Sequence, residues 1–278
     1  MSYQPQASDT HPEIDRFLMQ AFRQMPTWKK AHLINEATKG IQQWAIAGIR
    51  HQYPDATPTE IRFYLAVRWL GKDTANQLYQ DNEGKILDAE SIRLALRVAE
   101  ILEALAIPYL IDGSIASSIL GEPRATLDVD VVADLQFHVT PLLQVMTGEF
   151  FIDEMMVREA IERKSSFNII HLDSMQKVDI FVLSNQPLAQ IEMQRRQQLV
   201  ITQNPDKSAW IASAEDIILQ KLIWYRLGNQ VSDRQWRDVL GVLKVQADRL
   251  DFNYLNQWAE TLKLEDLMRQ ALQEAGLG

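Results

Sequence analysis

The chain of 278 residues contains no cysteine, and no apolar run in it approaches the roughly 18 residues that cross a bilayer. The missing cysteine excludes disulfides, thiolate zinc sites and a cysteine nucleophile. Residues 1–15 are polar and lack the apolar segment of a secretory signal peptide. The sequence therefore predicts a soluble, cytoplasmic protein with no membrane partner.

The chain also has few positive charges: it contains 28 Lys and Arg residues against 37 Asp and Glu residues, which gives a formal net charge of −9. An acidic chain is a poor general binder of polyanions, although it can still contain a local basic groove. No Walker A, GxGxxG or GxSxG motif is present, and the histidines lack ligand spacing. We therefore do not expect a P-loop or Rossmann nucleotide-binding site, a serine hydrolase site or a zinc site.

The hydrophobic pattern changes period along the chain. It predicts a disordered lead over residues 1–12, a helical N-terminal domain over 13–80, and a further domain over 89–278, joined by a polar linker at 81–88. After Pro205 the pattern is again helical. In the N-terminal domain, residues 57–60 predict a helix-capping box, and the Trp and Phe residues of its helices are expected in the core rather than in a ligand cage. We expect an α+β fold: a small mixed β-sheet with helices, an N-terminal helical domain and C-terminal helices.

Two short segments between these helical parts alternate as half-buried strands do. Around Asp128 and Asp130, residues 127, 129 and 131 are apolar, and Asp179 lies in a similar segment after Lys177. Two neighbouring carboxylates repel each other unless a cation lies between them, and carboxylate oxygens suit Mg²⁺ or Mn²⁺. The alternatives are an acidic, solvated strand face and an ion pair between Asp179 and Lys177.

A third short strand, residues 109–111, leads through Gly113 and Ser114 into a helix of small residues. Glycine permits close approach of the backbone, and the N-terminus of a helix favours phosphate. The alternative is an ordinary strand-to-helix turn.

The order of these features resembles the minimal nucleotidyltransferases of the DNA polymerase beta superfamily: Gly-Ser, a short helix, Asp-x-Asp, then a later acidic residue. Three segments resemble the AbiEii-type toxin branch in particular: the form Gly-x-x-Arg-x-Thr-x-Asp-x-Asp at 121–130, and residues 213–221 and 234–238. The resemblance covers about residues 90–245. It departs from the pattern at Asp112, which adds negative charge before Gly113, and at residues 235–238, which match a downstream motif only in part.

The resemblance implies a role for each matching residue. Asp128, Asp130 and Asp179 would be the catalytic, metal-binding carboxylates, with Mg²⁺ or Mn²⁺ as cofactor and a nucleoside triphosphate, ATP included, as substrate. The residues that would bind the triphosphate are Gly113, Ser114, Lys221, Arg124 and Thr126. The alternative for Lys221 is a place on a solvated helix face. Arg124 could instead be a surface residue, and both Arg124 and Thr126 could support the loop before the strand.

The implied activity is transfer of a nucleoside monophosphate to a hydroxyl group of an RNA such as tRNA, a protein or a small molecule. The toxin-like resemblance adds a possible role in a toxin–antitoxin pair, with an antitoxin or another partner on the helical domain. A non-catalytic interaction protein built on the same fold is the competing hypothesis, because a fold alone does not establish activity.

Overall fold

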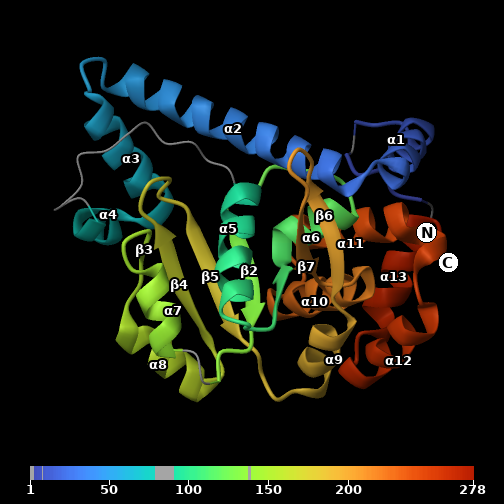
Figure 1. Ribbon diagram of the computed structural model, residues 1–278. Helices are drawn as coiled ribbons and strands as arrows, with labels where there is room; N and C mark the ends of the chain where they lie inside the picture. The colour runs from blue at the N-terminus through green and yellow to red at the C-terminus, as the bar shows by residue number, and fades with distance from the viewer. Residues whose placement is uncertain (1–2, 8, 79–90, 137–138) are drawn as a thin grey trace. The chain divides into compact units, whose positions relative to one another are not determined.

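The computed structural model describes residues 3–7, 9–78, 91–136 and 139–278 (Figure 1). These residues form thirteen α-helices and seven β-strands, with both parallel and antiparallel strand pairs. The expected α+β class with a mixed sheet is therefore confirmed. The predicted linker at 81–88 lies outside the described residues. Among the described helices, none combines the length and the apolar character that a membrane span requires.

The contacts within the chain define two compact units, each built from segments that are far apart in the sequence. Unit 1 comprises Met1–His32, Ile111–Arg124 and Ile191–Gly278, and unit 2 comprises Leu33–Leu110 and Ala125–Gln190. The domain boundaries expected at residues 80 and 89 stay a prediction.

The strands of unit 2 lie in the order β3 (Phe150–Phe151), β4 (Ser166–His171), β5 (Lys177–Val182) and β2 (Val129–Ala133). β2 and β5 are parallel, and the other two pairs are antiparallel. The alternation has its expected effect, because Val129 and Val131 in β2 are buried, and Val178, Ile180 and Val182 in β5 are buried too. Helix α5 (Ser91–Ala104) contacts β2, α8 (Glu154–Arg163) contacts β4, and α7 (Val139–Met146) contacts both helices.

The N-terminal helices of unit 2 share a hydrophobic core with the β4–β5 hairpin. These helices are the later part of α2 (Thr27–Gln52), α3 (Pro58–Leu70) and α4 (Lys72–Leu78). The capping box expected at Thr57 is confirmed, since its side chain and that of Glu60 satisfy each other's backbone N–H groups. The core joins residues of the three helices to two residues of the hairpin: Ile49, Ile61, Leu65, Ala66, Ala75, Ile170 and Met175.

The strands of unit 1 include a hairpin that the sequence pattern did not predict. β6 (Gln197–Thr202) and β7 (Lys207–Ile211) pair antiparallel, and Ile111 of β1 (Tyr109–Asp112) pairs with Ile211 in parallel. The prediction of helix directly after Pro205 was therefore wrong. β7 ends in three consecutive apolar residues, Ala209, Trp210 and Ile211, and so lacks the polar–apolar alternation seen in β2 and β5. Its pairing with β6 and β1 decides its conformation.

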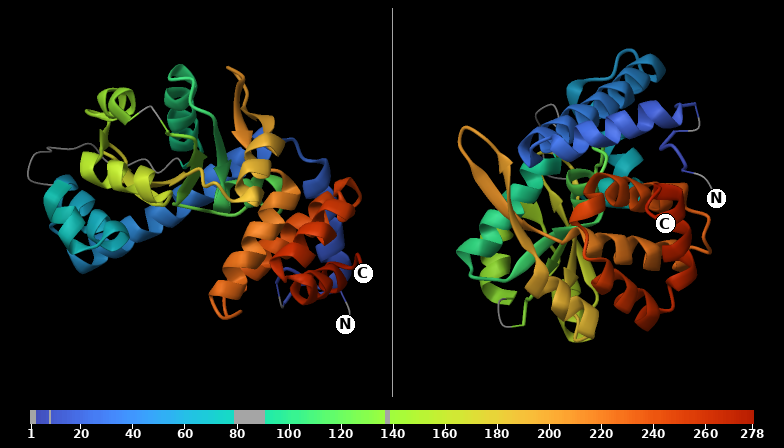
Figure 2. Two further views of the ribbon diagram at one scale, coloured as in Figure 1. Left: turned by 90° about the horizontal axis from the view of Figure 1, so that it is seen from below. Right: turned by 90° about the vertical axis from the view of Figure 1, so that its right-hand side faces the viewer.

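The helices of unit 1 gather around α11 (Asp233–Gln246). Figure 2 shows the C-terminal helices side by side, and contacts join α11 to α10 (Ala214–Leu227) and α13 (Glu265–Ala275), and α12 (Phe252–Leu262) to α10 and α13. Helix α6 (Gly113–Leu120) packs against α10 and α11. The remaining helices in this part of the chain are α9 (Pro187–Arg195) and a short 3₁₀ turn (Ala247–Arg249).

Gln4 and Gln6 lie in the segment 1–12 that the sequence predicts to be a disordered lead, and both make specific backbone contacts. The Gln4 N–H donates to the Glu274 carbonyl (2.8 Å) and the Gln6 N–H donates to the Asp15 carboxylate (2.8 Å). Asp15, in α1 (Pro12–Gln24), is buried and pairs with the buried Lys244 at 3.1 Å. The apolar residues expected to face the core, among them Phe17 at 69% exposure, lie on the surface instead. A buried ion pair therefore fixes the orientation of α1.

Candidate active site

The turn between β1 and α6 has the geometry expected of the Gly-Ser segment. Gly113 adopts φ +62°, a left-handed conformation that glycine reaches without strain. Strand β1 therefore passes directly into α6, and Ser114 lies buried in the first turn of this helix. The start of α6 presents backbone N–H groups and the positive end of the helix dipole, which together favour an anion.

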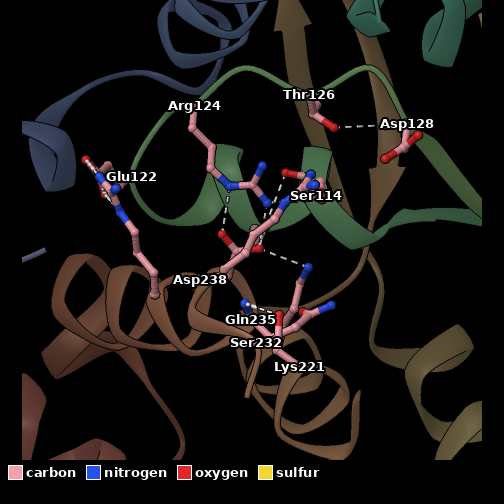
Figure 3. A network of polar contacts seen from close by, with 12 residues as sticks. Ser114, Glu122, Arg124, Thr126, Asp128, Lys221, Ser232, Gln235 and Asp238 are labelled. Carbon is pink, nitrogen blue, oxygen red and sulfur yellow. Dashed lines mark hydrogen bonds and ion pairs between the residues drawn. The ribbon is translucent and has the colours of Figure 1, made fainter. Parts of the chain in front are cut away.

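Cationic side chains gather beside this helix start, and Figure 3 shows Arg124 and Lys221 reaching Asp238. The Ser114 hydroxyl accepts a hydrogen bond from Arg124 Nη2 and another from Arg234 Nη2, each at 3.1 Å. Lys221 and Arg124 both reach the carboxylate of Asp238. We call Arg124, Lys221 and Arg234, together with Ser114 and Asp238, the basic cluster. All five residues belong to unit 1.

Asp238 holds the basic cluster together. Its carboxylate accepts two hydrogen bonds from Arg124, at 2.8 and 2.7 Å, and lies 3.0 Å from Lys221 Nζ. Burial alone would raise the pKa of Asp238, but the Arg124 hydrogen bonds and the Lys221 charge hold that pKa below its ordinary value. Arg124 is therefore not a surface residue, and Lys221 is not on a solvated face: its side chain is only 7% exposed.

Gly121 sets the path of the loop that carries Arg124. A Cβ atom at this position would lie 2.8 Å from the Ser117 carbonyl oxygen and 2.9 Å from the Val242 amide nitrogen. No other residue could approach α11 so closely without moving backbone. This contact explains why the Gly-x-x-Arg segment begins with glycine: the close approach brings Arg124 within reach of Asp238.

The carboxylates of unit 2 are placed by the pairing of β2 with β5. Asp130 is the direct partner of Asp179 in this parallel pair, and Asn168 of β4 is the partner of Asp179 on its other side. Since the neighbouring positions Val129 and Val178 are both buried, Asp130 and Asp179 share the opposite face of the sheet. Oxygen donors side by side on one face suit the coordination chemistry of Mg²⁺ or Mn²⁺.

Asp128 lies just before β2, in a segment fixed by two threonines. The Thr126 hydroxyl donates to the Asp128 carbonyl (3.2 Å), and the Thr126 backbone exchanges hydrogen bonds with the Thr38 hydroxyl at 3.2 and 3.1 Å. Thr126 is buried, so these contacts favour support of the loop over contact with phosphate. Leu127, expected on the strand, precedes it.

A lysine side chain lies among the three aspartates. Lys177 Nζ is 2.8 Å from Asp179 Oδ2. Burial lowers the pKa of Lys177, but the Asp179 hydrogen bond and the charges of Asp179, Asp128 and Asp130 outweigh burial and raise it. As the side chains stand, no three acidic or histidine residues in the described part of the chain form a ready metal cage. The ion pair that the sequence left open as an alternative for Asp179 is therefore present.

Unit 1 also buries a group of acids that the sequence did not single out. Burial, and then the charges of Asp112 and Asp216, raise the pKa of Glu192 to about 9, although the Glu192 carboxylate accepts a hydrogen bond from Gln220 at 2.8 Å. Burial likewise raises the pKa of Asp112 and of Asp216. Burial thus works against the negative charge that the sequence places at Asp112, beside Gly113.

We expect Glu192→Gln to stabilise the protein increasingly as the pH rises. Between the ordinary pKa of 4.5 and about 9, Glu192 is protonated when folded and ionised when unfolded, so wild-type stability falls with pH. The neutral amide avoids this loss. Urea unfolding should show a gain of about 2.5 kcal/mol more at pH 7 than at pH 5. Exposed Glu260→Gln is the control, and parallel pH profiles for wild type and Glu192→Gln would contradict the expectation.

Comparison with known proteins gives structural likeness only. No protein-family model and no curated protein matches the chain. Among solved structures, the chain is similar to an antigenic nucleotidyltransferase-like protein from Paracoccidioides brasiliensis, with 22% identity and a TM-score of 0.45 over 67% of this chain and 91% of that one. It is also similar to the antibiotic-resistance factor ANT(2'')-Ia, with 10% identity and a TM-score of 0.39 over 65% and 90% of the two chains.

One of these two structures is thus described as nucleotidyltransferase-like. At these identities and TM-scores, neither likeness identifies the activity of this chain. Neither description mentions the AbiEii-type branch, and membership of that branch stays a prediction.

Proposed function

We propose that the protein is a metal-dependent nucleotidyltransferase, which moves a nucleoside monophosphate from a nucleoside triphosphate to a hydroxyl group. The observation that carries the proposal is the convergence of Arg124 and Arg234 on Ser114 at the start of α6, with Lys221 beside them on Asp238. Arg124 and Lys221 share the Asp238 carboxylate and Arg234 contacts Ser114, which gives the basic cluster an excess of positive charge near a helix N-terminus. Such an excess in a protein of net charge −9 suits a polyanionic ligand, and a triphosphate tail fits both the charge and the hydrogen-bond donors.

Within this proposal, the basic cluster binds the triphosphate tail. Ser114 and the backbone N–H groups after Gly113 would donate to phosphate oxygens, while Arg234, which is exposed, would turn from the serine hydroxyl to the ligand. Arg124 and Lys221 are held in place by Asp238 and supply fixed positive charge. Fixed charges stabilise a developing negative charge without having to reorganise during the reaction.

Asp128, Asp130 and Asp179 would hold the divalent metal, and a bound metal would supply Lewis-acid stabilisation of the attacking and leaving oxygens. The Asp179 carboxylate would also help to orient and deprotonate the acceptor hydroxyl. The chain runs only four residues from Arg124 to Asp128. That segment spans at most about 14 Å when fully extended, a reach compatible with both groups acting on one nucleotide.

The acceptor is the least defined part of the proposal. An RNA end, a protein side chain and a small molecule all offer a suitable hydroxyl. The net charge of −9 argues against a long RNA, because phosphate contacts dominate the affinity for nucleic acid. A role as one member of a toxin–antitoxin pair rests only on the resemblance of residues 121–130, 213–221 and 234–238.

One observation favours the second candidate, a non-catalytic protein on the same fold. Lys177 already supplies a cation to Asp179 at 2.8 Å, so part of the repulsion among the carboxylates is relieved without a metal. In that case the protein would bind nucleotide, or none, without transferring it.

The test is incubation of the protein with Mg²⁺, a cell extract and each nucleoside triphosphate labelled at the α-phosphate. We expect one nucleotide to label a macromolecule or metabolite, and digestion with nuclease or protease then identifies the class of acceptor. Asp130→Asn should give no label. If wild type and Asp130→Asn give the same faint background with all four nucleotides, the non-catalytic candidate is favoured.

We expect a nucleoside triphosphate with Mg²⁺ to raise the melting temperature of the wild-type protein, since a ligand that binds only the native state stabilises it by about 2.7 kcal/mol at a hundred times its Kd. The Asp128→Ala/Asp130→Ala double variant should lose the Mg²⁺-dependent part of this shift. Arg234→Gln should lose about tenfold in affinity, the effect of one charge-assisted hydrogen bond. Exposed Arg269→Gln on α13 should behave as wild type. An unchanged shift in both test variants would place nucleotide binding elsewhere.

A further inference from the structure

Lys177 is the first residue of β5, and the strand pairing places it beside the aspartates. Since Val178 pairs with Val129, Lys177 is level with Asp128, the residue before Val129. Its ammonium lies 2.8 Å from Asp179 Oδ2, and its side chain remains 37% exposed. The ammonium is thus close to the carboxylates yet open to solvent on one side.

The three aspartates need a cation nearby. Two like charges on adjacent positions of paired strands destabilise the pair, and here Asp130 lies directly opposite Asp179 with Asp128 two residues upstream. Lys177 supplies one positive charge against three negative charges. Without a metal, this single charge relieves part of the repulsion and leaves a net negative field that still attracts a divalent ion.

We propose that the Lys177 ammonium is a built-in counter-ion of the aspartate group, which competes with the divalent metal for the same carboxylate oxygens. The inference rests on the proposed function, because it assigns the metal to these residues. A metal must approach a carboxylate oxygen to about 2.0–2.6 Å, and the ammonium now lies 2.8 Å from Asp179 Oδ2. A metal held at that distance would lie close to the ammonium and repel it, so we expect Lys177 to swing into solvent when the metal binds.

This competition has a consequence for the order of binding. It makes the site weak for a free metal ion, because each binding event must first break the Lys177–Asp179 ion pair. A metal that arrives already bound to a triphosphate gains the contacts of the nucleotide as well. Lys177 therefore favours loading of the metal together with nucleotide over loading of the metal alone.

Calorimetric titration with Mn²⁺ alone tests the competition. We expect Lys177→Gln to bind Mn²⁺ about fivefold more tightly than wild type, the order expected when one partly exposed ion pair no longer has to be broken. Lys177→Arg keeps the cation and should bind as weakly as wild type. Lys72→Gln removes the same charge at an exposed position in α4 and should change nothing. Equal or weaker binding by Lys177→Gln would overturn the inference and leave the proposed function standing.

A measurement on the wild-type protein keeps the inference testable if Lys177→Gln does not fold. Acetylation by a water-soluble reagent, followed residue by residue with mass spectrometry, reports how available each ammonium is. Mn²⁺ should increase the modification of Lys177 several-fold, because the ion pair opens, and should leave Lys72 unchanged. Saturable Mn²⁺ binding with no change at Lys177 would overturn the competition alone. Absence of saturable Mn²⁺ binding would overturn both the metal site and the competition.

Discussion

Replacing Asp238 with alanine should lower the free energy of unfolding by about 3–5 kcal/mol, the cost of removing one partner from a buried ion pair. The Asp238 side chain is 5% exposed and accepts hydrogen bonds from Arg124 while pairing with Lys221 at 3.0 Å. Without the carboxylate, the mostly buried Lys221 ammonium and the Arg124 guanidinium face each other and the positive end of α6. Urea unfolding at neutral pH, monitored by tryptophan fluorescence, measures the loss.

Asp248→Ala is the matched control, because it removes an aspartate from an ion pair of the same length, 3.0 Å to Arg23, at a position 78% exposed. An exposed pair of this kind contributes about 1 kcal/mol or less. If Asp238→Ala cost no more than Asp248→Ala, the basic cluster would not be held by Asp238, and the explanation for the positions of Arg124 and Lys221 would be wrong.

Asp179→Asn should reduce nucleotidyl transfer by a factor on the order of 10² or more, the scale of losing positioned acid–base assistance. Asparagine keeps the size of the side chain but loses its negative charge and its ability to accept a proton. Binding of metal and triphosphate should survive in part, through Asp128, Asp130 and the basic cluster. The measurements are a transfer assay with the acceptor identified and calorimetry with a non-hydrolysable triphosphate.

Asp173→Asn serves as the control, since it makes the same change at an exposed position of the turn between β4 and β5. It should leave both transfer and binding intact. Equal transfer by wild type and Asp179→Asn would remove Asp179 from the mechanism. A complete loss of triphosphate binding in Asp179→Asn would instead assign this residue to binding rather than to the chemical step.

The strands that carry the aspartates were predictable because their signal is local. Alternation places Val129, Val131, Val178 and Ile180 on one side, and burial on that side leaves Asp130 and Asp179 on the other. The capping box at Thr57 and the left-handed glycine at the start of α6 are local too. A pattern read within a few residues identifies such features, since neighbouring residues are enough to determine them.

The partners of these residues could not be predicted in the same way. Arg124 and Asp238 are 114 positions apart, and Arg234 and Ser114 are 120 apart. Nothing in the sequence near Lys221 indicates that it faces Asp238 rather than solvent. Only the packing of α6 against α10 and α11 brings these side chains together. The Arg234 contact had a weak signal, its place within the downstream 234–238 segment.

Burial of charged residues caused the other differences. Apolar residues of α1 and α2 were expected inside, yet Phe17 is 69% and Trp44 81% exposed. The buried face of α1 instead carries Asp15, which pairs with Lys244 more than two hundred residues later. A prediction from an amphipathic pattern assumes that the apolar side of the helix faces the core. In α1 a buried ion pair faces the core instead.

Transfer of the α-phosphate and not of the γ-phosphate is the central claim, and one measurement tests it directly. The protein is incubated with Mg²⁺, a cell extract and the same nucleoside triphosphate labelled either at the α- or at the γ-phosphate. We predict that the α-label enters the acceptor, that the γ-label leaves as pyrophosphate, and that Asp130→Asn does neither. An acceptor labelled only from the γ-phosphate, or no acceptor labelled from either while the wild-type protein binds the nucleotide, would contradict the account.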